Sequence, residues 1–220
     1  MNFLLEIYLT LVCRKYGVKV VEMTSYEDLL RANSFLQEES ANYFGHEKIP
    51  QTEELVRPEG LVGSFCIQKG QTIIGTVSLF DPMRIESFAS HAYTDHELHF
   101  DKAKTLELGR LILKLEEQRA DSLTYFLLLH ACYKRTKACG RTQWLCTGHY
   151  RIIRQAKYLG GQIKILARGT KIAQKDNFQT YYYSNLKIEE AANNYSAFLV
   201  RCDDKALQRA IKKYCKKKWK

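Results

Sequence analysis

A strand pattern that runs directly into a long helix pattern, and then into a second strand pattern, constrains the fold of this sequence most. The first strand is expected near Thr105 to Leu113, where the run TLELGRLIL is mostly apolar. A helix follows, capped by Asp121 or Ser122 at its start and closed by Gly140. The run TQWLCT after that glycine is typical of a further strand. This order predicts a sheet with a helix packed across one face.

Patterns on the N-terminal side add further elements. The first 17 residues are expected to form a packed helix, and the run GVKVVEM that follows predicts a short strand. Ser25, with Asp28 three residues on, is close to a capping box and predicts the start of a second helix. Two β-rich runs on either side of Lys69 and Gly70 predict a hairpin.

On the C-terminal side, the run GHYRIIRQAKYLGG predicts a helix, and the runs QIKILAR and YSAFLVRC predict strands. Antiparallel hairpin strands thus precede strand–helix–strand units. We therefore expect an α/β fold: one domain over residues 1–220, with a mixed, mostly antiparallel central sheet and helices on both faces.

The charge of the chain is concentrated at its C-terminal end. The formal net charge is +10, and residues 201–220 contain nine basic and two acidic residues, a net of +7, which leaves +3 for the rest. Residues 203–220 are expected to form a basic amphipathic helix. Such a helix attracts acidic surfaces, namely nucleic acid, anionic lipid or an acidic carrier protein. A solvated helix that aids solubility is the alternative.

The seven cysteines favour a reducing compartment. Their number is odd, no CxxC occurs, and several lie in apolar runs, which fits free thiols better than disulfides or structural zinc. The N-terminal run lacks a basic region and a cleavage site, so it does not resemble a targeting segment. We therefore expect a cytoplasmic protein. The His-rich and acidic stretch between His91 and Asp101 matches no known spacing of a metal site, so no metal is expected.

A carboxylate and a guanidinium inside the first strand are candidates for chemistry. In a regular strand, Glu107 and Arg110 would point to opposite faces, because side chains alternate. A β-bulge at Gly109 would bring both to one face. The pair would then have a catalytic or substrate-orienting role, or would be an interior salt bridge that only fixes the strand.

The turn EEQRADS before the expected helix is a candidate anion site. A helix N-terminus presents unbonded N–H groups and a favourable dipole to phosphate. Arg119, Ser122 and Thr124 could add donors, although the turn contains no glycine and is neither a Walker loop nor a GxGxxG loop. Ordinary helix capping is the alternative.

The stretch from Gly60 to Arg168 resembles the central part of the GCN5-related N-acyltransferase superfamily. Within it, ELGR resembles the E-[LI]-[SG]-R strand of acyl-homoserine-lactone synthases and N-acyl amino acid synthases. The resemblance implies transfer of an acyl group from a phosphopantetheine thioester, carried by acyl carrier protein or coenzyme A, to an amine such as an amino acid. It implies catalytic roles for Glu107 and Arg110, and donor-binding roles for Ile112, Leu113, Lys114, Arg119, Ser122 and Thr124.

This sequence departs from the family pattern in informative ways. The glycines of the pyrophosphate loop are missing, with Ser122 and Thr124 at their positions, which favours a carrier-protein donor over coenzyme A. The tyrosine that many members use as a general acid is Ala156, and the acidic stretch of lactone synthases is not evident near Glu53 and Glu54. These differences favour an amine acceptor other than that of the lactone synthases.

The resemblance also suggests how the site would work. Glu107 would take the proton of the attacking amine, Arg110 would keep that carboxylate ionised, and a free backbone N–H near Ile112 to Lys114 would hold the thioester oxygen. Two alternatives remain open. One is an acetyl-coenzyme-A-dependent enzyme of the same fold, and the other is a catalytically silent basic module in which Tyr181 to Tyr183 stack on bases or the tail binds a membrane.

Overall fold

The computed structural model describes residues 3–44, 51–87, 89–90, 97–117, 123–149, 153–154, 157, 162–168 and 195–202 of the chain. The described helices are α1 (Phe3–Tyr16), α2 (Tyr26–Phe44), α3 (Glu53–Val56) and α5 (Leu123–Ala138), with 3₁₀ turns η1 (Lys102–Lys104) and η2 (Leu115–Glu117). The described strands are β1 (Val18–Glu22), β2 (Leu61–Lys69), β3 (Thr72–Phe80), β4 (Thr105–Leu113), β5 (Gln143–His149), β6 (Gln162–Arg168) and β7 (Tyr195–Arg201).

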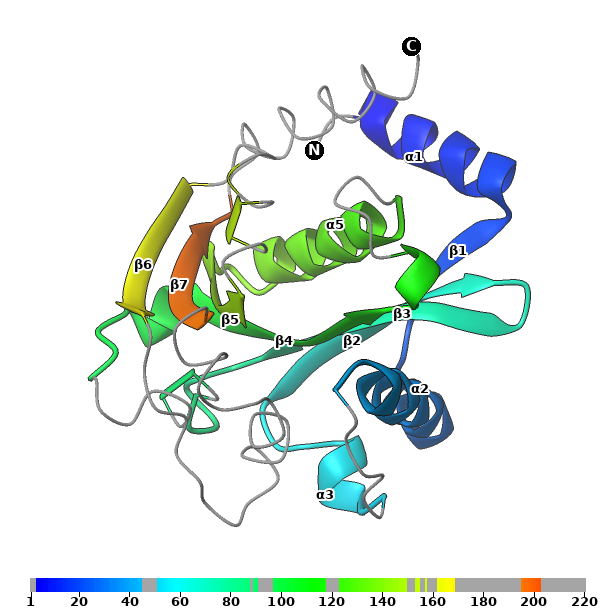
Figure 1. Cartoon of the computed structure of the whole chain (residues 1–220). Coiled ribbons are helices and arrows are strands. Elements are labelled where there is room, and N and C mark those ends of the chain that lie inside the picture. The colour runs from blue at the N-terminus through cyan, green and yellow to red at the C-terminus, as the bar shows by residue number, and fades with distance from the viewer. Residues whose placement is uncertain are drawn as a thin grey trace.

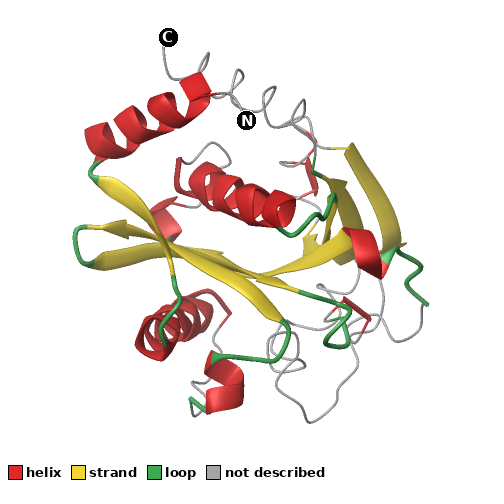
Figure 2. Cartoon of the chain, turned by 180° about the vertical axis from the view of Figure 1, so that it is seen from behind, coloured by secondary structure: helices red, strands yellow, loops and turns green. Residues whose placement is uncertain are grey.

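These strands form one sheet in the order β1-β2-β3-β4-β5-β7-β6. β4 and β5 pair in parallel, and the other neighbouring pairs are antiparallel. Helices α1 and α5 lie on one face of the sheet, and α2 and α3 lie on the other (Figures 1 and 2). The expectation of a mixed, mostly antiparallel sheet with helices on both faces is confirmed.

Local signals in the sequence explain where several elements begin and turn. The Ser25 hydroxyl donates to the Asp28 carboxylate at 2.8 Å and accepts from the Asp28 amide at 3.1 Å, which forms the predicted cap of α2. Gly70 at the β2–β3 turn and Gly140 after α5 have φ of 61° and 67°, the left-handed region in which glycine is unstrained.

Two apolar layers hold the helices to the sheet. Side chains of α1 and α5 pack on one face around Leu106, Leu108 and Trp144. Those of α2 and α3 pack on the other face around Cys66 and Ile112. Because alternate residues of β4 face opposite layers, Glu107 lies on the face that α2 and α3 cover.

Some predictions fall outside the described residues. They are the basic helix at residues 203–220, most of the helix from residue 148 to 161, and the roles of Arg119, Ser122 and the tyrosines at 181–183. Within the described part of the chain, no helix is long and apolar enough to cross a membrane. The same residues contain no group of three or more His, Cys, Asp or Glu that could hold a metal ion.

A buried histidine between α1 and α5 makes stability depend on pH. His130 Nε2 lies 3.5 Å from Glu6 Oε1 on α1, and Lys134 lies 3.4 Å from the same carboxylate. Burial lowers the pKa of His130 below its usual 6.5, and Lys134 adds to this, whereas the Glu6 carboxylate opposes it. The neutral imidazole is therefore the form that the folded state favours.

We expect the free energy of unfolding to fall as the pH is lowered from about 6.5 toward the lowered pKa of His130, because the unfolded chain binds the proton first. Above about pH 6.5, the neutral His130 makes its full contribution to the free energy of unfolding. Urea unfolding of the wild type and of His130→Phe at several pH values checks the expectation. The difference in stability between the two proteins should change in this window, and a constant difference would contradict it.

Candidate active site

A β-bulge interrupts β4 directly beside the charged pair. Thr76 on β3 pairs with Ile112, and Ser78 pairs with Gly109, so three steps along β4 match two along β3. The extra residue is accommodated at Arg110, whose φ is 52°. Among the residues that the structure describes, it is the one non-glycine residue in the left-handed region. The predicted bulge is therefore present, one residue after Gly109.

The bulge places Glu107 and Arg110 on the same face of the sheet. Phe80 on β3 is the cross-strand partner of Glu107. The Arg110 guanidinium carbon lies 5.5 Å from the centre of the Phe80 ring, over its face. A Cβ atom at Gly109 would lie 3.2 Å from the same ring, so the glycine leaves room for Phe80 beneath the pair. Phe80 thus links the two charged residues across the bulge.

Arg110 connects β4 to α3. Its Nη2 donates to the Leu55 carbonyl oxygen at 2.8 Å, and its own carbonyl accepts from the Thr76 hydroxyl at 3.3 Å. Leu55 is buried and Arg110 is half-buried. A charge-assisted bond to a helix carbonyl fixes the guanidinium at the edge of the α2 and α3 layer.

Glu107 is a buried carboxylate with a defined partner. Its exposed fraction is 2%, and its Oε1 accepts the Ala89 backbone N–H at 2.8 Å. A buried carboxylate requires such donors, because desolvation of the charge is otherwise costly. Burial raises the pKa of the neighbouring Cys146 thiol, and the charge of Glu107 adds to this effect. Glu107 is thus a buried carboxylate that a backbone N–H holds in place.

Strands β4 and β5 separate beside Glu107 and Arg110. Their parallel pairing runs from Thr105 with Gln143 to Leu108 with Cys146. Both strands continue beyond it, β4 to Leu113 and β5 to His149. Because the pairing ends just before the bulge, the far half of β4 turns its β5-facing edge away from a sheet partner.

The predicted donor-binding residues of β4 lie along this half of the strand. Ile112 and Leu113 pair with Thr76 and Gly75 of β3. The Lys114 amide donates to the Ile74 carbonyl oxygen at 3.0 Å, so this amide is not free for a thioester oxygen, contrary to the expectation at that position. Because N–H directions alternate in an antiparallel ladder, the Leu113 N–H points to the β5 side.

At the start of α5, the Thr124 hydroxyl has a partner within the protein. Thr124 is buried, with an exposed fraction of 2%, and its hydroxyl donates to Glu117 Oε2 at 2.8 Å. This bond joins η2 to the first turn of α5. Near Lys114 and Glu116, the Glu39 carboxylate on α2 has a pKa that burial raises, that Lys114 lowers and that Glu116 raises further. The described surroundings of Lys114 are therefore rich in carboxylates.

Sequence reasoning missed three groups at this site. The Ala89 amide and the Leu55 carbonyl are backbone groups, so no residue type in the sequence marks them. Phe80 ends a long apolar run and has no distinctive neighbours. The hairpin register could have identified Phe80, since it pairs the end of β3 with Glu107.

No protein-family model matches the sequence. No curated protein matches it either. Solved structures do match over most of the chain. TofI, solved in a ternary complex with an inhibitor and MTA, is 12% identical, with 89% of this chain and 96% of TofI covered and a TM-score of 0.62.

Two further structures extend the comparison. BjaI, a CoA-dependent acyl-homoserine lactone synthase solved with SAM and isopentyl-CoA, is 13% identical, with 90% and 89% of the two chains covered and a TM-score of 0.62. The Salmonella typhimurium protein yncA, described as an acetyltransferase and solved with acetyl-CoA, is 10% identical, with 86% and 95% covered and a TM-score of 0.52. The chain thus shares its fold with solved structures of an acyl-homoserine lactone synthase and of a protein described as an acetyltransferase.

Proposed function

We propose that this protein is an N-acyltransferase that moves an acyl group from a thioester donor to an amine such as an amino acid. The observation that carries the proposal is the bulge in β4. It brings a buried carboxylate and a guanidinium to one face, next to the point where β4 and β5 separate. The N-acyltransferase fold adds support, since this opening is where the sequence resemblance expects the thioester.

The chemistry required of the site is modest. The neutral amine attacks the thioester carbonyl carbon, the C–N bond forms, and the C–S bond breaks. Glu107 takes the proton that the amine loses, directly or through one water, and the thiolate that leaves takes up a proton in turn. Holding the two reactants together contributes much of the rate. Glu107 suits this task because its carboxylate is buried and is held in place by the Ala89 N–H.

Arg110 holds the site in shape and sets its charge. A guanidinium on the same face favours the ionised form of a buried carboxylate. Its bond to the Leu55 carbonyl also fixes α3 against the bulge. Arg110 therefore orients the acceptor side of the site while Glu107 manages the proton.

The donor would lie along the β5-facing edge of β4. Ile112, Leu113 and Lys114 would flank the pantetheine, and Arg119, Ser122 and Thr124 would lie near its phosphate. Thr124 would act by holding η2 on α5, since its hydroxyl already donates to Glu117. The carboxylates near Lys114 disfavour a polyphosphate, which supports a carrier-protein donor over coenzyme A. The basic C-terminal segment would dock the acidic carrier.

A donor competition tests the proposal. Purified protein is incubated with an amino-acid mixture and with acyl carrier protein thioesters, acyl-CoA of several lengths, or acetyl-CoA. Intact-mass analysis of the carrier and of the small products measures acyl loss and amide formation. We expect amide formation to be fastest with a carrier-protein thioester. Faster turnover of acetyl-CoA would favour the acetyltransferase alternative, and no product with any donor would refute the proposed function.

A further inference from the structure

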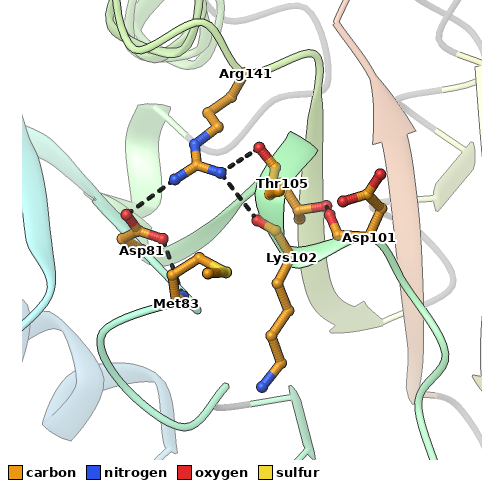
Figure 3. Close-up of polar contacts among 7 residues, drawn as sticks. Asp81, Met83, Asp101, Lys102, Thr105 and Arg141 are labelled. Carbon is orange, nitrogen blue, oxygen red and sulfur yellow. Dashed lines mark hydrogen bonds and ion pairs between the residues drawn. The ribbon is translucent and has the colours of Figure 1, made fainter.

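Arg141, just before β5, ties together the two ends of the segment between β3 and β4. Its Nη2 lies 3.1 Å from Asp81 Oδ2, directly after β3. Its Nη1 donates to the Lys102 carbonyl oxygen at 3.2 Å and to the Ala103 carbonyl oxygen, directly before β4 (Figure 3). We call Arg141, Asp81 and these two carbonyls the clasp. One guanidinium thus spans both ends of the segment.

The ion pair of the clasp is largely shielded from water, and its carboxylate is held by a second bond. The exposed fractions of the Arg141 and Asp81 side chains are 17% and 14%, so water screens this ion pair less than an exposed one. Asp81 Oδ1 also accepts the Met83 amide at 3.0 Å, which fixes the carboxylate. Only the planar fork of arginine can reach a carboxylate and two carbonyls at once.

Further hydrogen bonds join the starts of β4 and β5 close to Arg141. The Thr105 hydroxyl donates to the Asp101 carbonyl oxygen at 2.6 Å and accepts from Gln143 Nε2 at 2.8 Å. The Thr142 amide donates to the Lys104 carbonyl oxygen at 3.0 Å. The starts of β4 and β5 are therefore fixed to each other at the position where the segment returns to the sheet.

The segment between β3 and β4 contains Ala89, whose N–H is the hydrogen-bond donor to Glu107. Ala89, with an exposed fraction of 0%, gives its N–H to Glu107 Oε1 at 2.8 Å. Its methyl group packs in a small core with Leu145 of β5. The buried Ser87 hydroxyl accepts the Ser90 amide at 3.2 Å, which closes a tight turn around Ala89.

We propose that Arg141 is a positioning residue for Glu107, acting through the Ala89 amide. The inference rests on the proposed function, because it assigns Arg141 a part in aligning the proton acceptor. Fixing both ends of a chain segment restricts where its middle can lie. The clasp holds the Ala89 N–H against one carboxylate oxygen, which leaves the Glu107 group in a single orientation toward the reacting amine.

Hydrogen exchange tests whether Arg141 holds the Ala89 amide in place, and this test does not require enzymatic activity. Exchange at residues 87–90 is followed by mass spectrometry in the wild type, in Arg141→Gln and in Arg141→Lys. Arg141→Lys keeps the charge beside Asp81 but lacks the fork. Arg135→Gln is the matched control, since Arg135 pairs with Glu22 away from the segment. We expect exchange at Ala89 to accelerate at least roughly tenfold in both Arg141 variants and to stay unchanged in the control.

Enzyme kinetics test whether Arg141 aligns Glu107 for acyl transfer. We expect kcat to fall roughly tenfold or more in Arg141→Lys while KM for the thioester changes little, because a misplaced base costs rate rather than donor binding. Unchanged exchange at Ala89 overturns the inference whatever the activity. Faster exchange with an unchanged kcat overturns the positioning role. If the wild type transfers no acyl group at all, the proposed function fails, and the exchange data still decide whether Arg141 holds the Ala89 amide.

Discussion

Replacing Glu107 with glutamine is expected to slow acyl transfer by about 10²- to 10⁴-fold, the usual contribution of a positioned general base. The glutamine side chain has the same shape, and its carbonyl oxygen can still accept the Ala89 N–H that Glu107 Oε1 accepts at 2.8 Å. It cannot take up a proton from the amine. The fold should therefore persist while the chemical step is lost.

Single-turnover acyl transfer from the preferred donor measures this effect, with thermal unfolding as the check on the fold. Glu22→Gln is a suitable control, because the Glu22 carboxylate on β1 pairs with Arg135 and lies outside the proposed site. Transfer by Glu107→Gln at more than a tenth of the wild-type rate would show that Glu107 is an interior structural group and not the base.

Substitution of Arg110 is expected to lower kcat by roughly one to two orders of magnitude, since one charged group that orients the site is lost. Two variants separate the side chain from the backbone. Arg110→Ala loses the bond to the Leu55 carbonyl and the contact with Phe80, and it keeps a left-handed residue with a Cβ. Arg110→Gly loses the same contacts but removes the backbone strain.

We expect Arg110→Gly to be more stable than Arg110→Ala by about 1 kcal/mol, the cost of a left-handed backbone for a residue with a Cβ. Both should lose activity to a similar degree. Arg57→Ala, at an exposed arginine just after α3, controls for the loss of one positive charge. If Arg110→Gly were as active as the wild type, the bulge alone would be required and the guanidinium would have no role.

Much of the fold could be predicted because its signals are local. The strand at Thr105 to Leu113 and the capped helix from Ser25 agree with the structure, as does the hairpin around Gly70. The bulge could also be inferred, since two charged residues three apart in a buried strand are hard to accommodate without one. These features depend on residues that lie close together in the sequence.

The rest of the site depends on backbone groups that distant parts of the chain supply. Glu107 is held by Ala89 and Arg110 by Leu55, 18 and 55 residues away. Nothing in the side chains of Ala89 or Leu55 encodes these contacts. The Lys114 amide shows the same limit, because its bond to Ile74 follows from the register of β3 and not from any local pattern.

The bulge at Arg110 also gives β4 two phases. Before it, odd-numbered residues such as Glu107 face α2 and α3; after it, Ile112 faces that side and Leu113 the other. Deleting Leu111 would restore a regular alternation and leave both halves of the strand on their present faces, because Glu107, Gly109 and Ile112 already share one face with their partners on β3. The two apolar layers would keep their residues, but Arg110 would turn to the face that α5 covers. The extra residue in β4 is therefore required to bring the guanidinium to the side of Glu107 and not to build the core, so this deletion should remove the charged pair while the fold persists.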